Sequence, residues 1–206
     1  MAVKLGFEPL AEVYDAVGLA SAPLPQMRAG VVPNLRTIDR AIATRVAFGA
    51  DVEPTPLQLA SSFSVFAAGG QHRPLSVTLA GQRPSRQVFT QETSARMQRL
   101  LAQTVMRDDG TGAQARLPGV TVAGKTGTFQ LQEGVSWANF AGFAVGGRYV
   151  ILVGIETSSA GYSGGTLAAP SFARVLSALN ASHPSPSTLS PGRGKRFRAA
   201  GRSCRP

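Results

Sequence analysis

Apolar side chains recur every three or four residues in four segments, a spacing that lines one face of a helix. The predicted helices span 10–17, a segment from Pro56 to just before Gly69, 92–107 and 170–180. The start of the second helix is clearly indicated, because Thr55 can cap it and Pro56 suits a first helical turn. The residues expected on the apolar faces are Leu59, Phe63 and Phe66; Met97, Leu100, Leu101 and Val105; and Phe172, Val175, Leu176 and Leu179.

In the second half of the chain the apolar residues no longer follow a helical spacing and instead form short runs typical of strands. Segments 119–128, 137–145 and 148–156 are predicted strands, and the last is apolar on both faces at its centre. Gly146-Gly147 predicts a two-residue type I′ hairpin turn, since paired glycines accept positive φ. Segments 21–37 and 161–166 are predicted as a proline-rich loop and a turn. The expected fold class is α/β, an antiparallel sheet with helices packed on it.

Composition separates a folded body from a basic tail. The 206 residues are 43% hydrophobic and 16% charged, with a net charge of +10. That is too apolar for a disordered chain, and no apolar run is long enough to span a bilayer. Segment 181–206 holds six of the basic residues and no acid, which leaves +4 for 1–180. We expect 181–206 to be a disordered tail, rich in Ser, Pro and Arg.

The residues that could bind metals or form disulfides are few. Cys204 is the only cysteine, which excludes an internal disulfide, and His72 and His183 do not form a ligand pair with it. We expect no metal or organic cofactor. Cys204 is expected to be an exposed thiol and His72 a loop residue. The N-terminal residues contain no apolar segment typical of a signal peptide.

The most informative string is Lys125-Thr126-Gly127-Thr128, at the end of a predicted strand. A Lys-Thr-Gly triplet is expected by chance roughly 0.02 times at this composition, and a predicted strand pair follows it. The string resembles the Lys-Thr-Gly box of the penicillin-recognising enzymes, the β-lactamases and penicillin-binding proteins. Other parts of the chain resemble the septal, division-specific branch of class B penicillin-binding proteins: 48–49, 54–60, 67–70, 73–75, 110–115, 162–165 and 168–172.

This resemblance covers about 1–180 and implies a peptidoglycan D,D-transpeptidase, an acyl-transfer enzyme of septal wall synthesis. Lys125 would present a positive charge, and Thr126 and Thr128 would offer hydroxyls to the substrate carboxylate. The Thr128 N–H would be an oxyanion-hole donor, and Gly127 would permit close backbone approach. The implied partners are the D-Ala-D-Ala stem peptide, β-lactams and division or cell-wall proteins, at the outer face of the cytoplasmic membrane.

The chain also departs from this family. The three lysines are preceded three residues earlier by Met1, Val122 and Gly192, so the nucleophilic Ser-x-x-Lys motif is absent. No asparagine completes the Ser-x-Asn motif. We therefore expect a C-terminal portion with the last three strands of a five-stranded sheet, without nucleophile or membrane anchor, and inactive alone. Segment 49–51 also departs from a Gly-Tyr-Gly-like turn.

Three alternatives remain open at this stage. A β-lactamase or D,D-carboxypeptidase relative would share the same box. A non-catalytic module could hold a stem peptide or a protein partner without turnover. A nucleic-acid binder could act through 193–205, although the bias to Arg over Lys is weak evidence for phosphate recognition, and no nucleic acid is expected. Trp137 and Phe140 are expected in the core, and 162–165 to be a turn or to line the site.

Overall fold

The computed structural model describes residues 4, 6–78, 83–159 and 161–183. The elements in this part of the chain are α2 (Glu8–Ala16), α3 (Arg40–Val46), α4 (Pro56–Ala67), β1 (Gln71–His72), β2 (Arg86–Gln87), α5 (Gln91–Met106), η2 (Ala113–Ala115), β3 (Val122–Gln132), β4 (Val135–Ala144), β5 (Val150–Thr157), η3 (Gly164–Ala168) and α6 (Ala169–Ser182). The predicted tail at 181–206 lies almost wholly outside the described residues, so its disorder stays a prediction. None of the described helices is long and apolar enough to cross a bilayer.

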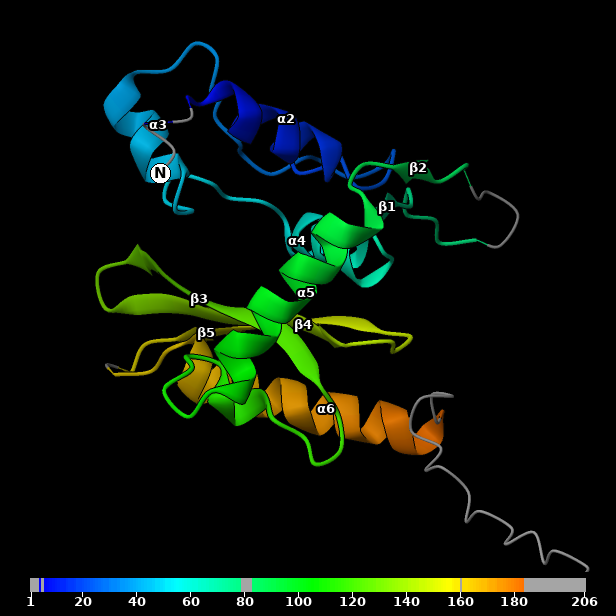
Figure 1. Cartoon of the computed structure of the whole chain (residues 1–206). Coiled ribbons are helices and arrows are strands. Elements are labelled where there is room, and N and C mark those ends of the chain that lie inside the picture. The colour runs from blue at the N-terminus through cyan, green and yellow to red at the C-terminus, as the bar shows by residue number, and fades with distance from the viewer. Residues whose placement is uncertain (1–3, 5, 79–82, 160, 184–206) are drawn as a thin grey trace, which may run out of the picture.

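The central element is an antiparallel sheet in the order β3-β4-β5. In Figure 1 this sheet lies between α4 above and α6 below, while α5 runs diagonally past β3. The register places Lys125 opposite Ala141 and Ala141 opposite Leu152. The α/β fold class, with helices packed on an antiparallel sheet, is confirmed.

The core lies between the sheet and α6. Phe140 of β4 and Phe172 of α6 are fully buried, with ring centroids 4.7 Å apart in an edge-to-face arrangement. Val105 at the end of α5 joins the same cluster. The aromatic pair adds about 0.5–1.5 kcal/mol to the stabilisation that comes from area burial alone. The expectation that Phe140 belongs to the core is confirmed.

Helix α4 begins as predicted but buries a different face. Thr55 accepts a hydrogen bond from the Gln58 N–H at 3.2 Å, and the Gln58 side chain accepts from the Thr55 N–H at 3.0 Å. This reciprocal capping box satisfies two otherwise unpaired donors. The predicted stripe of Leu59, Phe63 and Phe66 is only half-buried, whereas the residues that are buried are Gln58, Ser61, Ser62 and Val65. The polar face is the buried one because the Gln58 side chain bonds to the carbonyl oxygens of Leu19 and Ser21, in the loop packed against α4.

Helices α5 and α6 have the predicted places but narrower buried stripes. On α6, Phe172 and Leu176 are buried, while Val175 is 43% exposed and Leu179 is half-buried. On α5, Leu100 is 56% exposed. A helix that contacts a sheet along one line buries only the residues on that line. Predicting Val175 and Leu100 as inward was therefore wrong.

The turns differ from the sequence prediction. Between β4 and β5 the chain bends at Val145-Gly146, because the Gly147 N–H bonds back to the Ala144 oxygen at 2.8 Å. Only Gly146 of the glycine pair has positive φ, at 74°. The predicted type I′ turn at Gly146-Gly147 is therefore wrong, since that turn needs positive φ at both positions.

The predicted boundary of the first strand also shifts. Val120 lies outside β3 and forms an isolated bridge with Leu117. The predicted turn at 161–166 instead enters η3, a wide helical turn that begins at Gly164 and is capped by Ser163. Here tertiary packing decides the local conformation.

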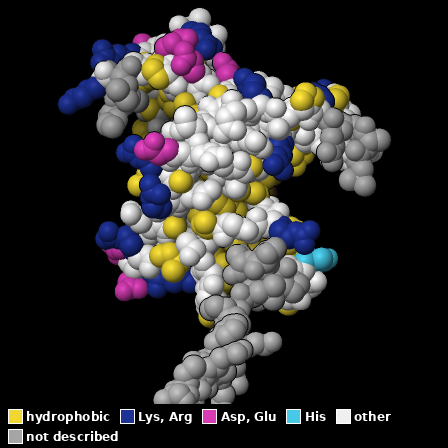
Figure 2. All heavy atoms as spheres, turned by 45° about the vertical axis from the view of Figure 1, so that its right-hand side comes forward, with side chains coloured by type: hydrophobic (Ala, Val, Ile, Leu, Met, Phe, Trp, Pro, Cys, Tyr) yellow, Lys and Arg dark blue, Asp and Glu magenta, His cyan; other side chains and the backbone are white. Residues whose placement is uncertain are grey.

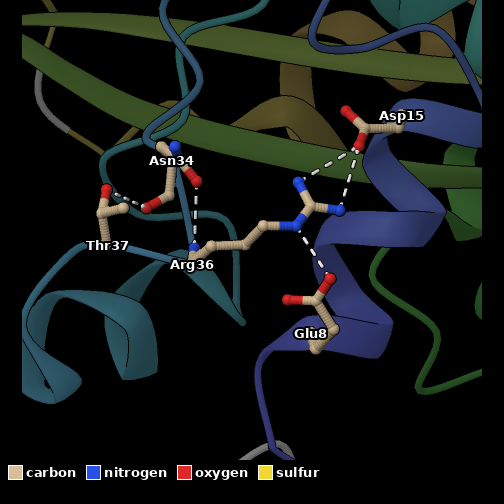
Figure 3. A network of polar contacts seen from close by, with 5 residues as sticks. All are labelled: Glu8, Asp15, Asn34, Arg36 and Thr37. Carbon is tan, nitrogen blue, oxygen red and sulfur yellow. Dashed lines mark hydrogen bonds and ion pairs between the residues drawn. The ribbon is translucent and has the colours of Figure 1, made fainter.

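The N-terminal region has a small core of its own, and in Figure 1 its helices α2 and α3 lie above α4. Helix α3, which the sequence analysis missed, is capped by the Asp39 side chain, and that cap was a visible signal. Figure 3 shows Arg36 reaching α2, where it bonds to Glu8 at 2.8 Å and Asp15 at 3.4 Å. Exposed pairs of this kind contribute little each, so Arg36 chiefly fixes the path of its segment.

The unusual segment 49–51 has a simple local explanation. Asp51 adopts φ of 59°, the left-handed region that glycine usually occupies. Aspartate tolerates this region better than most residues. Its carboxylate also binds Arg45 at 2.6 Å, which holds the turn after α3 closed.

Candidate functional site

The outer edge of β3 presents a row of backbone groups. The Val145 N–H donates to the Thr121 oxygen at 2.9 Å, which fixes the phase of the β3–β4 ladder. Ladder bonds in an antiparallel pair alternate along each strand. The N–H and C=O groups of Gly124, Thr126 and Thr128 therefore point away from β4, toward the free edge. An extended ligand could add to this edge as a further strand.

Helix α5 covers one end of this row. The Thr104 hydroxyl donates to the Gly124 oxygen at 2.5 Å. A Cβ on Gly124 would lie 2.4 Å from the ring of Phe140, so only glycine fits there. The covered end leaves Thr126 and Thr128 as the accessible part of the edge.

Lys125, Thr126 and Thr111 form a chain of polar contacts. The Lys125 ammonium donates to the Thr126 carbonyl oxygen at 2.8 Å and lies 3.5 Å from the Thr126 hydroxyl. That hydroxyl donates to the Thr111 hydroxyl at 3.0 Å. Lys125 is exposed and, within the described part of the chain, forms no ion pair. The site thus offers a positive charge beside two hydroxyls.

Thr128 is held by the start of η3. Its hydroxyl accepts a hydrogen bond from the Gly164 N–H at 3.1 Å. Ser163 and Thr166 cap this turn reciprocally, with the Ser163 N–H donating to the Thr166 hydroxyl at 2.8 Å. The Thr128 hydroxyl makes no donated hydrogen bond among the described residues, so its proton is available to a ligand.

Two glycines let η3 approach the strand pair. A Cβ on Gly164 would lie 2.2 Å from the Asn139 carbonyl oxygen and 2.6 Å from that of Gly127. A Cβ on Gly127 would lie 2.7 Å from the Asn139 side chain. Close backbone contact of this kind is possible only without a side chain. The expected approach at Gly127 is therefore occupied, on one side, by the Asn139 amide.

The four predicted site residues, from Lys125 to Thr128, are consecutive on β3, and their roles stay a prediction. The structure adds Thr111 and Gly164, which lie in the strings 110–115 and 162–165 but are not predicted site residues. Tyr162 is 48% exposed, and the segment after it packs on β3. Trp137 is half-buried over Gly154, where a Cβ would lie 2.0 Å from its ring. Trp137 is thus a packing residue, as expected.

The histidines lie elsewhere. His72 was expected in a loop, but it lies in strand β1 and pairs with Arg86 of β2, so that prediction is wrong. Its pKa is lowered, first by burial and then by the nearby charge of Arg86. The His183 ring lies 6.4 Å from that of Tyr149. In the described ranges no three His, Cys, Asp or Glu residues gather as metal ligands would. Cys204 lies outside those ranges, so its exposure stays a prediction.

Comparisons with known proteins give a consistent result. The family model described as "Penicillin binding protein transpeptidase domain" matches residues 1–177. The chain is 30% identical over 190 residues to the probable peptidoglycan D,D-transpeptidase PbpC of Pseudomonas aeruginosa, covering 85% of this chain and 33% of that protein. It is 30% identical over 203 residues to the probable peptidoglycan D,D-transpeptidase FtsI of Caulobacter vibrioides, covering 85% and 34%. The chain spans about a third of the length of these curated relatives.

Solved structures resemble the fold described above. Penicillin-binding protein 3 of Mycobacterium tuberculosis, in complex with ampicillin, matches with a TM-score of 0.77 and 26% identity, covering 93% of this chain and 49% of that one. The transpeptidase domain of penicillin-binding protein 3 from Burkholderia pseudomallei matches with a TM-score of 0.74 and 23% identity, covering 92% and 61%. The second match supports the fold alone.

Proposed function

This chain belongs to the penicillin-binding protein transpeptidase domain family, and from that premise we propose that its β3 edge is one wall of a peptidoglycan D,D-transpeptidase site. The single observation that carries the proposal is the arrangement at 125–128. An ammonium group, two hydroxyls and an outward-pointing N–H lie along one open strand edge. These groups match the needs of an acyl donor that ends in a carboxylate.

Each group has a distinct proposed role. The Lys125 ammonium and the hydroxyls of Thr126 and Thr128 bind the terminal carboxylate of a D-Ala-D-Ala stem peptide. The Thr128 N–H donates to the attacked carbonyl oxygen as negative charge develops on it. The peptide backbone lies along β3 as an added strand. A β-lactam, which also carries a carboxylate and a reactive carbonyl, occupies the same edge.

The proposed reaction is acyl transfer in two steps. A serine hydroxyl attacks the carbonyl carbon of the D-Ala-D-Ala peptide bond, its proton passes to the leaving amine, and D-alanine departs. An amine of a neighbouring strand then attacks the resulting ester and releases the serine as the cross-link forms. We propose that this serine lies outside the 206 residues, since these contain no Ser-x-x-Lys motif. The chain alone would then form no acyl-enzyme.

The cellular setting is part of the proposal. The FtsI-type names among the relatives support a role in septal wall synthesis. The reaction would take place at the outer face of the cytoplasmic membrane, where stem peptides are cross-linked, with division and cell-wall proteins as partners. The β-lactamase, carboxypeptidase and non-catalytic alternatives gain no separate support from the described site.

A labelled penicillin tests the proposal in two arms. In the first arm, the purified 206-residue chain is incubated with a fluorescent penicillin and separated on a denaturing gel. We expect no stoichiometric covalent band. In the second arm, an antibody raised against the chain captures the native protein from cells treated with the same penicillin. We expect a fluorescent band that excess unlabelled ampicillin removes.

The two arms fail in different ways. A captured native protein without label would contradict the transpeptidase function. A labelled 206-residue chain would support acylation but refute the external nucleophile, and mass spectrometry of the labelled peptide would then identify the serine.

A further inference from the structure

A small cavity lies between the start of α4, β1 and the loop after α2, and we call it the α4–β1 cavity. Its volume is about 120 Å³. A cavity needs about 10–15 Å³ of such volume for one water molecule, so this one has room for a group of several heavy atoms. The residues of interest in its lining are Ser21, Gln58, Ser61, His72 and Arg83. None of them belongs to β3 or η3.

The floor of the cavity is rigid. The buried Gln58 amide nitrogen donates to the Leu19 oxygen at 2.7 Å and to the Ser21 oxygen at 2.9 Å. Its amide oxygen accepts from the Gly30 N–H at 2.8 Å and from Thr55. With these bonds made, Gln58 is fixed and has no donor left for a ligand.

Ser61 is different from its neighbours on α4. The hydroxyls of Ser62 and Ser64 bond back to helix carbonyls, at 2.8 Å and 2.6 Å. Ser61 is only 8% exposed, lines the cavity, and its hydroxyl has no hydrogen-bond partner among the described residues. Among the described residues the Ser61 hydroxyl is not one of the fully buried side-chain atoms that lack a partner, so it is open to the solvent of the cavity. A ligand in the cavity could therefore accept its proton.

The charge around the cavity has one sign. Arg83 lines it, and no lining residue is acidic. Segment 54–91 contains three arginines and no Asp or Glu. In Figure 2 no acidic side chain is visible around the β1–β2 hairpin on the face shown. The lowered pKa of His72, caused by burial and Arg86, agrees with surroundings that lack a carboxylate. An anion fits these surroundings, and a cation does not.

We propose that the α4–β1 cavity binds a small oxyanion group, a phosphate or a carboxylate, through the Ser61 hydroxyl and the Arg83 guanidinium. Charge-assisted bonds from these two groups supply affinity and orientation. The His72 imidazole, packed against Gly18, closes one side of the cavity. This site is separate from the β3 edge and does not depend on acyl transfer there.

Equilibrium dialysis of the 206-residue chain against radiolabelled inorganic phosphate, at constant ionic strength, tests the proposal. We expect one saturable site per chain, with Kd of about 1 mM or below. Ser61→Ala and Arg83→Gln should each weaken binding about tenfold, because each removes a bond to a charged group. The matched control is Arg73→Gln, since Arg73 is an exposed arginine of the same hairpin that does not line the cavity.

The outcomes separate clearly. Competition by acetate at similar concentrations assigns the site to carboxylates, and competition by methyl phosphate alone assigns it to phosphate groups. The proposal is overturned if binding does not saturate, if Ser61→Ala binds as the parent does, or if Arg73→Gln loses as much affinity as Arg83→Gln. Circular dichroism checks each fold, and the exposed Arg83 position keeps the test decisive if Ser61→Ala misfolds.

Discussion

The two outer strands of one sheet, β3 and β5, present opposite chemistry at their free edges. Along β3 the outward backbone groups lie beside threonine hydroxyls, the Lys125 ammonium group and the N-terminal turn of η3. Along β5 the outward backbone groups belong to a strand whose centre, 150–153, is apolar. No charged residue lies between Arg148 and Glu156. Both strands pair with β4 in the same antiparallel way.

The difference supports the proposal that the β3 edge is a binding site, because polar side chains shape that edge and apolar ones the other. Charged residues, short strands and coverage normally prevent such edges from pairing with other chains. The β3 edge is partly covered and polar, so it favours a ligand with matching charge. The β5 edge lacks these protections in the described residues, so it favours another strand. The following experiments test that contrast, in order of decreasing expected effect.

The largest effect is expected for Lys125→Ala in the penicillin-labelled native protein. The substitution removes a fixed positive charge beside a carboxylate and a developing oxyanion, which costs a few kcal/mol, or about 10²–10³ in acylation rate. Lys125 is exposed, so little packing is lost. Stopped-flow acylation by a fluorescent penicillin measures the rate, and a thermal melt checks that the variant is folded. Near-normal acylation would refute the proposed role of Lys125.

The next effect concerns the β5 edge. Size-exclusion chromatography of the purified chain should show self-association, because apolar edge strands pair with one another. The ladder phase directs the N–H of Leu152 outward and that of Ile151 toward β4. Leu152→Pro should therefore keep the fold and increase the monomer fraction severalfold, since proline is tolerated where the N–H faces outward.

Ile151→Pro is the matched control for this experiment. It removes an internal ladder bond one residue away, so we expect loss of the cooperative thermal transition. A sharp monomer peak from the unmodified chain would show that the β5 edge does not pair with other chains, contrary to the comparison above.

A smaller effect is expected at the turn that holds Thr128. In Gly164→Ala the new Cβ would lie 2.2 Å from the Asn139 oxygen, so η3 must move away from β3. Overpacking of this kind costs about 1–3 kcal/mol, measurable as a lower urea midpoint. Gly161→Asn is the control, because nothing lies within 4 Å and asparagine tolerates the positive φ of 85°. Equal midpoints for the two variants would exclude the contact as a stabilising feature.

The smallest effect is expected for Thr128→Val. The substitution keeps the shape but removes the acceptor for the Gly164 N–H, with a cost of about 1 kcal/mol. Differential scanning calorimetry should show this as a fall in Tm of about 2–4 °C. Thr121→Val, at an exposed position just before β3, should change Tm much less. A larger fall for Thr121→Val would count against the Thr128 bond.

The sequence was sufficient for features whose signals lie within a few residues. The capped start of α4 follows from Thr55, Pro56 and Gln58, and the Lys125–Thr128 string lies on the predicted strand. The α/β class and the positions of three strands along the chain also followed from local period. Asp39 marked α3 in the same way, although that signal was overlooked.

Only the tertiary structure decided which distant residues meet. Thr111 and Thr126 are 15 positions apart, and Gly164 and Thr128 are 36 apart, yet each pair shares a hydrogen bond. No local pattern encodes such contacts, because they depend on the path of the whole chain around the sheet. The same reason explains why Val175 and Leu100 are exposed although their spacing is apolar. Local sequence determined the elements of this protein, and packing decided which of their faces became the core and which came together at the candidate site.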